Sequence, residues 1–502
     1  MDNQGMNGLG TTSSLRRRVR RTDSSGSERT FYALAESTRV AWERVKSLYS
    51  SDPDTRTADM SDVKQGYRFI DPLASETTIF VITSLFMFFL MCQLYLSRKQ
   101  LIELLQNLEF HSVEVIIVMI LLLTVQVAYR LHKVRPVFLL DFVTYKAPER
   151  LATSTEHFLE LSERAGVFNQ DQLAFQRKLL ERSGLGEKTS FPDAMHRADE
   201  IKNANGNGHV VLNMHNARME AEQVIFGVLD ELFAKNNIDP KVDIDILIVN
   251  CSLFNPTPSL SAMVVNKYKM KQSIRTYNLA GMGCSAGLIA VDLCKDLFQA
   301  HKNVRCVIVS TENITQNWYL GKEKSMLISN TLFRLGGAGI LLSNRGADRR
   351  LARFQLMHTV RTHSGAVDLA YDSIFQMEDK EGIRGVKLSK NIMDVAGNAL
   401  KSNVTTLAPL VFPFAVHIKF GLYVLKKKVL KMKSIPPFVP DFHRAFKFFC
   451  IHTGGRGVLD VLEDALKLTQ DDLKPSRFVL ERFGNVSSAS VWYEMEYVEK
   501  CG

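Results

Sequence analysis

The chain has few cysteines, and they are too scattered to form a disulfide framework or a metal cluster. The seven cysteines are an odd number, and none of them forms a CxxC pair. No group of Cys and His has the spacing of a zinc site. This pattern favours reduced thiols in a cytosolic setting. A cysteine with a special role must therefore be recognised from its local sequence.

The chain contains two long apolar runs, and the first lacks the pattern expected of a cleavable signal peptide. Residues 77–96 carry no charged side chain and have the length needed to span a bilayer. They lie too far from the start of the chain, and lack the cleavage pattern, for a signal peptide. A second run, residues 113–129, is shorter and includes Glu114, so a tilted or re-entrant helix also fits. We predict a transmembrane helical hairpin in residues 71–135.

Charge is distributed unevenly, and the formal net charge is +10. Basic residues precede the hairpin at Arg16–Arg21 and follow it at Arg130, Lys133 and Arg135. Because positive loops stay on the cytosolic side, both ends of the hairpin are expected in the cytosol. A nucleic-acid or nuclear-import patch is the other interpretation of the arginine run, but beside apolar spans we expect no nucleic-acid partner. Residues 1–70, rich in Ser, Thr, Gly, Asp and Arg, are predicted to be a disordered cytosolic N-terminus.

From about residue 150 onward, short β-branched runs alternate with helical stretches, which is typical of an α/β fold. Predicted strands include residues 244–249, 306–310, 339–342 and 354–360. Predicted helices include residues 217–234, 285–300 and 391–403. The alternation occurs before and after about residue 350, which suggests two related halves, 136–350 and 351–502.

The stretch from Ala408 to Lys433 combines prolines and aromatic residues with a basic tail. Its prolines, together with His417 and Lys419, argue against a third membrane span. Three interpretations remain: the stretch lines an acyl tunnel, lies on anionic lipid, or forms a solvated basic helix over the core.

A cysteine flanked by glycines, Cys284 in Gly281–Gly287, follows a predicted strand at 274–279 and opens an apolar helix. Small residues on both sides permit a sharp strand-to-helix turn. A thiol at the positive end of a helix is expected to have a lowered pKa and to be a nucleophile. The alternative is an ordinary buried cysteine beside glycines that allow close packing.

Two later segments repeat this arrangement of a polar residue beside glycine at the start of a helix. His452, in Cys450–Gly457, lies between a strand-like run and a predicted helix at 458–468. Its ring can donate a hydrogen bond to an oxyanion or act as a base, or it is a buried core histidine. Asn485 lies in Arg482–Ser490, where the alternative is a simple helix N-cap.

The order Cys, His, Asn resembles the decarboxylating condensing enzymes of the thiolase-like superfamily, and longer strings resemble plant-type 3-ketoacyl-CoA synthases. Those strings are Asn250–Ala262, Ser310–Tyr319, Leu332–Asn344, Val360–Gly365 and Asn403–Pro409. The paired N-terminal spans belong to the same pattern. The resemblance covers roughly residues 70–502. It implies a layered α-β-α-β-α fold of two related halves, preceded by the transmembrane hairpin.

The resemblance also implies the chemistry of very-long-chain fatty acid elongation. Cys284 would take the acyl group from a long-chain acyl-CoA, and His452 and Asn485 would donate hydrogen bonds to the thioester oxygen of malonyl-CoA. Loss of CO2 would leave an enolate that attacks the acyl-cysteine and releases a 3-ketoacyl-CoA. His363 matches a family histidine, for which a structural role is equally open. No metal or organic cofactor is implied.

The family further implies a homodimer in the endoplasmic reticulum membrane, with the catalytic domain facing the cytosol and with reductase and dehydratase partners. The sequence stops at Gly502, soon after the Asn485 helix, where family members usually continue. We therefore expect the half formed by residues 351–502 to lack its last strands.

Two alternatives remain at this stage. A type III polyketide synthase-like enzyme shares the order Cys, His, Asn, but the hairpin and the strings at 250–262 and 310–319 argue against it. A non-catalytic subunit of an elongase complex would fit the short C-terminal half.

Overall fold

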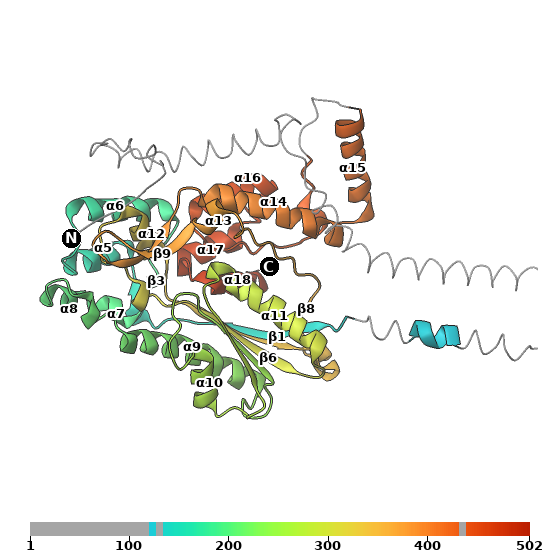
Figure 1. Cartoon of the computed structure of the whole chain (residues 1–502), viewed down its shortest axis with the longest axis horizontal. Coiled ribbons are helices and arrows are strands. Elements are labelled where there is room, and N and C mark those ends of the chain that lie inside the picture. Colours follow the sequence, from blue (N-terminus) through green and yellow to red (C-terminus); the bar gives the residue numbers. More distant parts are fainter. Residues whose placement is uncertain (1–119, 127–133, 431–437, 502) are drawn as a thin grey trace, which may run out of the picture. The chain divides into compact units, whose positions relative to one another are not determined.

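The computed structural model describes residues 120–126, 134–430 and 438–501 (Figure 1). The predicted N-terminus, 1–70, and most of the predicted hairpin, 71–135, lie outside these residues. The chain divides into two compact units, and every described residue belongs to the second, Ser51–Gly502. Among the described helices, none combines the length and the apolar character that crossing a bilayer requires.

A six-stranded sheet with strand order β5-β4-β6-β7-β1-β8 forms the centre of the fold. Its strands are β1 (Val137–Thr144), β4 (Ile246–Asn250), β5 (Arg275–Leu279), β6 (Arg305–Thr311), β7 (Gly337–Ser343) and β8 (Phe354–Leu356). Strands β5, β4 and β6 are parallel, and β7, β1 and β8 are added in antiparallel fashion. Two helices, α10 and α11, connect the parallel strands, as parallel pairing requires.

From residue 134 onward, the described α-helices occur in the following order. They are α5 (Thr155–Arg164), α6 (Gln170–Ser183), α7 (Asp193–His196), α8 (Ala198–Asn203), α9 (Met214–Asn236), α10 (Leu260–Tyr268), α11 (Ala286–Ala300), α12 (Lys324–Leu332), α13 (Asp368–Tyr371), α14 (Ile392–Val411), α15 (Phe414–Val424), α16 (Arg456–Leu466), α17 (Lys474–Phe483) and α18 (Ser490–Cys501). Two short strand pairs complete the fold, β2 (Ala152–Thr153) with β3 (Thr189–Ser190) and β9 (Ile374–Glu378) with β10 (Arg384–Leu388).

Helices cover both faces of the six-stranded sheet (Figure 1). On one face, Leu247 and Val309 pack in one apolar cluster with Val228 of α9. On the other face, Ile248 packs in a second cluster with Cys294 of α11, which also includes residues of α17 and α18. Successive strand residues point to opposite faces, so a strand buried on both faces must be continuously apolar. This explains why the central strands are recognisable as β-branched runs.

The described residues of 351–502 contribute β8 to this sheet, and β9 and β10 pair only with each other. Within the described ranges there is therefore one central β layer between helices, and the second β layer of the expected α-β-α-β-α arrangement is not formed there. The strand predicted before His452 is wrong, because residues 445–455 contain no strand. That segment lies against side chains instead of a neighbouring strand: the backbone N–H of Ile451 donates to Ser476 Oγ at 3.1 Å.

Candidate active site

The predicted turn around Cys284 is confirmed. Cys284 lies in a short 3-10 helix, η3 (Gly283–Ser285), between the end of β5 and the start of α11. Gly281 and Gly283 have φ values of 67° and 60°, which residues with a Cβ rarely adopt. Ser252 holds the loop through two hydrogen bonds. Its backbone carbonyl accepts from Gly281 N–H at 3.1 Å, and its hydroxyl donates to Gly283 O at 3.1 Å.

Asn485 is buried between the end of α17 and a second 3-10 helix, η8 (Ser487–Ala489). Its backbone N–H donates to Leu332 O at 3.3 Å, and its carbonyl accepts from Arg334 N–H at 2.9 Å. Its side-chain Oδ1 accepts from Ser487 N–H at 2.9 Å. This bond reaches only two residues along the chain, as in an Asx turn. The N-cap residue of η8 is Val486, which makes no side-chain cap bond, so the helix-cap interpretation of Asn485 is wrong. The Asn485 Nδ2 group is the donor of this side chain.

The Cys284 and Asn485 loops touch each other. The Ser487 hydroxyl donates to Cys284 Sγ at 3.7 Å. Gly287, one turn into the Cys284 helix, packs so closely against η8 that an added Cβ would lie 2.4 Å from Ser488 O. Two segments separated by about two hundred positions therefore meet in the fold, as expected if Cys284 and Asn485 belong to one site.

His452 lies in an irregular loop before α16, next to the Asn485 loop. The Thr453 hydroxyl, buried beside it, lies 3.2 Å from Gly484 O and 3.0 Å from Ser490 Oγ. Burial lowers the pKa of His452 to about 4. The ring is therefore neutral near physiological pH and carries one N–H donor.

A buried carboxylate, Glu312, contacts the segment that holds the Cys284 loop. It accepts hydrogen bonds from three backbone N–H groups, those of Ser252, Leu253 and Asn313, at 3.3, 3.0 and 3.2 Å. It also lies 3.5 Å from the Ser487 hydroxyl that reaches Cys284. Burial raises the pKa of Glu312, and the backbone donors oppose that rise.

The predicted lowering of the Cys284 pKa is wrong for this structure. Burial raises the pKa of Cys284 to about 11, the nearby Glu312 carboxylate raises it further, and the Ser487 hydrogen bond lowers it. Desolvation of the thiolate and repulsion by a carboxylate thus outweigh the stabilisation of the thiolate expected from the helix N-terminus. The free thiol is the resting form.

His363 is exposed in the structure, where its Nδ1 accepts from Gly365 N–H at 3.2 Å. Within the described residues no hydrogen bond or ion pair joins it to Cys284, His452 or Asn485. The structure brings the other three segments together without it, and a catalytic role for His363 stays a prediction.

Sequence reasoning missed Ser487 and Glu312. A signal was present for Glu312, which directly follows the predicted strand at 306–310, where polar residues gather at the ends of parallel strands. Ser487 follows Asn485 by two positions, but only the folded chain shows that its hydroxyl reaches the cysteine.

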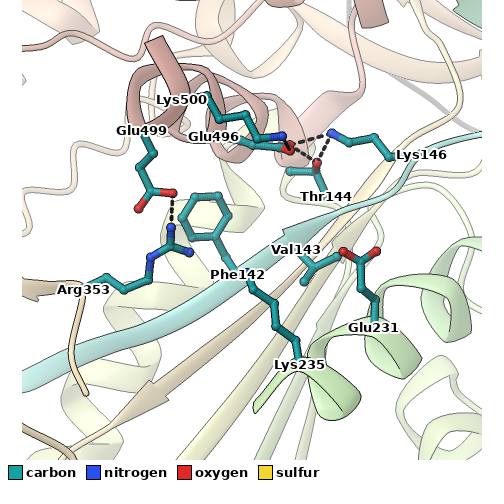
Figure 2. Close-up of a pocket in the computed structure, with 10 residues that line it drawn as sticks. All are labelled: Phe142, Val143, Thr144, Lys146, Glu231, Lys235, Arg353, Glu496, Glu499 and Lys500. Atoms are coloured by element: carbon teal, nitrogen blue, oxygen red, sulfur yellow. Dashed lines mark hydrogen bonds and ion pairs between the residues drawn. The ribbon is translucent and has the colours of Figure 1, made fainter. Parts of the chain in front are cut away.

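A cavity of about 250 Å³ lies between β1 and the end of α18, and Cys284, His452 and Asn485 do not line it (Figure 2). Its ten lining residues are Phe142, Val143, Thr144, Lys146, Glu231, Lys235, Arg353, Glu496, Glu499 and Lys500. Ion pairs cross it, such as Arg353 with Glu499 at 2.5 Å. No group of three or more His, Cys, Asp or Glu side chains suited to a metal ion occurs among the residues that the structure describes.

Comparison with known proteins matches two family models to the chain. Residues 129–429 match the model described as FAE1/Type III polyketide synthase-like protein, and residues 439–501 match the chalcone and stilbene synthases, C-terminal domain.

Curated relatives match over most of the chain. 3-ketoacyl-CoA synthase 4 of Arabidopsis thaliana is 51% identical over 79% of this chain and 74% of its own length. 3-ketoacyl-CoA synthase 9 of the same plant is 48% identical over 81% and 77%. Probable 3-ketoacyl-CoA synthase 20 of Oryza sativa subsp. japonica is 48% identical over 74% and 69%.

Proposed function

The chain belongs to the 3-ketoacyl-CoA synthase family, and from this premise we propose that it joins a long-chain acyl-CoA to malonyl-CoA in very-long-chain fatty acid elongation. The products are a 3-ketoacyl-CoA, CO2 and free CoA, so the enzyme is an acyltransferase. The observation that supports the assignment of the site is the chain of contacts from Cys284 through Ser487 and Asn485 to the His452 loop.

In the first step, the Cys284 sulfur attacks the thioester carbonyl of the acyl-CoA. An acyl–sulfur bond forms, the bond to CoA breaks, and the thiol proton is transferred to the departing CoA sulfur. Because burial keeps the free thiol protonated, the proton leaves as the new bond forms. The Ser487 hydroxyl at 3.7 Å donates to the sulfur and stabilises the negative charge that develops there.

In the second step, malonyl-CoA loses CO2 and leaves an enolate. The neutral His452 ring and the Asn485 Nδ2 group donate hydrogen bonds to its thioester oxygen as charge develops. The enolate carbon then attacks the acyl-cysteine carbonyl, and Cys284 leaves as a thiolate that regains a proton. A low pKa for His452 suits this role, since a neutral donor does not have to lose a proton to the enolate.

We propose that the reaction uses no metal or organic cofactor, because breaking the carbon–CO2 bond itself supplies the electron pair that forms the new bond. The substrates acyl-CoA and malonyl-CoA therefore carry all the chemistry that is needed.

We also propose the cellular setting from the sequence and the family. Residues 71–135 anchor the chain in the endoplasmic reticulum membrane as a hairpin, with both ends and the catalytic domain in the cytosol. A homodimer, and reductase and dehydratase partners of the elongation cycle, complete the proposal. No nucleic acid is a partner.

A type III polyketide synthase activity is the second candidate, since both matching family models include that class by description. The two activities differ in the number of condensations. Product analysis with labelled malonyl-CoA separates them: one added two-carbon unit before reduction supports the synthase, and repeated or cyclised additions support the polyketide enzyme.

The experiment that tests the proposed function uses microsomes from a heterologous host that carry this chain or its Cys284→Ala variant. They receive labelled malonyl-CoA and saturated acyl-CoAs of increasing length, starting at palmitoyl-CoA. A 3-ketoacyl product that requires Cys284 supports the proposal. Equal elongation with both forms would instead indicate a non-catalytic subunit of an elongase complex.

A further inference from the structure

Helix α15 and the following π-helical turn η6 (Leu425–Val429) carry an exposed apolar strip. Phe414, Ile418, Leu422 and Leu425 have exposed fractions of 78%, 50%, 51% and 46%. Their spacing of four, four and three residues places them on one face of the helix. Large apolar side chains that are both exposed and contiguous mark a binding surface.

The opposite face of α15 is already packed, so the strip is not a core face that has lost its partner. Val416 is 7% exposed and packs in one cluster with Phe412 and Phe442. The Tyr423 ring lies 5.8 Å from the Phe438 ring. The helix is therefore held on the protein by one side while the other side faces outward.

Lysines lie on the same helix and turn as the strip. Lys419 lies on α15, and Lys426–Lys428 follow on η6. Within the described residues no ion pair joins Lys419, Lys426 or Lys428 to a carboxylate, and Lys427 donates to Tyr423 OH at 3.0 Å. The sequence from 395 to 440 contains no Asp or Glu.

From these observations we infer that the outer face of α15 and η6 binds the surface of an anionic lipid bilayer. The apolar strip enters the boundary between headgroups and acyl chains, and the lysines contact the lipid phosphates. Eleven residues of helix are too short to cross a bilayer, so α15 lies along the surface. A protein partner would have to supply carboxylates opposite unpaired lysines and a groove for the strip.

This inference goes beyond the proposed condensation, and it connects to the site through packing. The cluster under α15 also contains Ile451, the neighbour of His452. The helix that would meet the bilayer and the loop that carries His452 therefore pack against one shared apolar cluster.

The test uses the full chain reconstituted in vesicles of phosphatidylcholine with phosphatidylserine. The photo-crosslinking residue p-benzoylphenylalanine replaces Phe414 in one sample. In a matched control it replaces Phe375, which is 38% exposed on β9. We expect several-fold more lipid adducts at position 414. Equal lipid adducts at the two positions would overturn the inference. Adducts at position 414 formed mainly with protein, including a second copy of the chain, would also overturn it.

A second arm tests the charges. In one experiment the vesicles contain phosphatidylcholine alone. In the other, the double variant Lys426→Glu, Lys428→Glu is placed in anionic vesicles. Each change should lower the lipid adducts at position 414 at least about fivefold, which is the effect of one charge near an anionic surface. Unchanged adducts would contradict the assigned lipid class. The Cys284→Ala variant should keep the adducts, which separates failure of this inference from failure of the proposed condensation.

Discussion

A single methyl group at Gly287 is expected to separate the two halves of the candidate site. The Cβ of an alanine there would lie 2.4 Å from the backbone oxygen of Ser488 and 3.1 Å from Ser310 Oγ. Ordinary contact begins near 3.4 Å, so the Cys284 helix and η8 must move apart by about 1 Å, and overpacking of this kind costs roughly 1–3 kcal/mol of stability. A displacement of about 1 Å between reacting groups lowers the rate on the order of a hundredfold.

The assay for Gly287→Ala is condensation of labelled malonyl-CoA in microsomes, with thermal unfolding of the purified chain measured in parallel. Gly397→Ala in α14 is the matched control, because a Cβ there meets no atom within 4 Å and alanine favours a helix. We expect Gly397→Ala to keep wild-type activity and to be at least as stable as the wild type. Wild-type activity in Gly287→Ala would refute the reasoning that close contact of the two loops positions Cys284 against Asn485.

Three further predictions concern individual groups of the site. Ser487→Ala removes the hydroxyl donor at 3.7 Å from Cys284 Sγ, so the burst of CoA release on acylation should slow roughly tenfold; an unchanged burst would show that the hydroxyl does not assist the sulfur. Glu312→Gln removes a carboxylate that raises the pKa of Cys284, so alkylation of Cys284 by iodoacetamide should reach its plateau at a lower pH than in the wild type, and an identical pH profile would argue against the electrostatic coupling. Burial lowers the pKa of His452 from 6.5 in the unfolded chain to about 4, so the unfolded state binds more protons between these values and stability falls as the pH falls through that window. His452→Gln should therefore lose less stability than the wild type between pH 6.5 and pH 4 in thermal unfolding, and parallel losses would exclude a buried neutral histidine.

The central strands could be predicted from the sequence because both faces of the sheet are covered. Ile248 and Val309 belong to short apolar runs of the kind expected for strands buried on both faces. The structure places the first run in β4 and the second in β6. The glycines around Cys284 likewise predict the turn, since their φ values require a residue without a Cβ. Local sequence suffices where local geometry decides the outcome.

The strand expected before His452 and the expected pKa of Cys284 depend on distant residues instead. A strand needs a neighbour to pair with, and the described segment before His452 bonds to Ser476 on α17. The pKa of Cys284 depends on burial by the folded chain and on Glu312, which reaches the site from the end of another strand. Neither effect is encoded within a few residues of the group that it acts upon.

The most direct test of the account is to trap the acylated enzyme. The full chain is incubated with a labelled long-chain acyl-CoA in the absence of malonyl-CoA, digested, and searched by mass spectrometry for the acylated peptide. The account predicts a thioester on Cys284 that disappears when malonyl-CoA is added and a 3-ketoacyl-CoA forms. Product formation with no acyl group on Cys284, or with the acyl group on another cysteine, would contradict it.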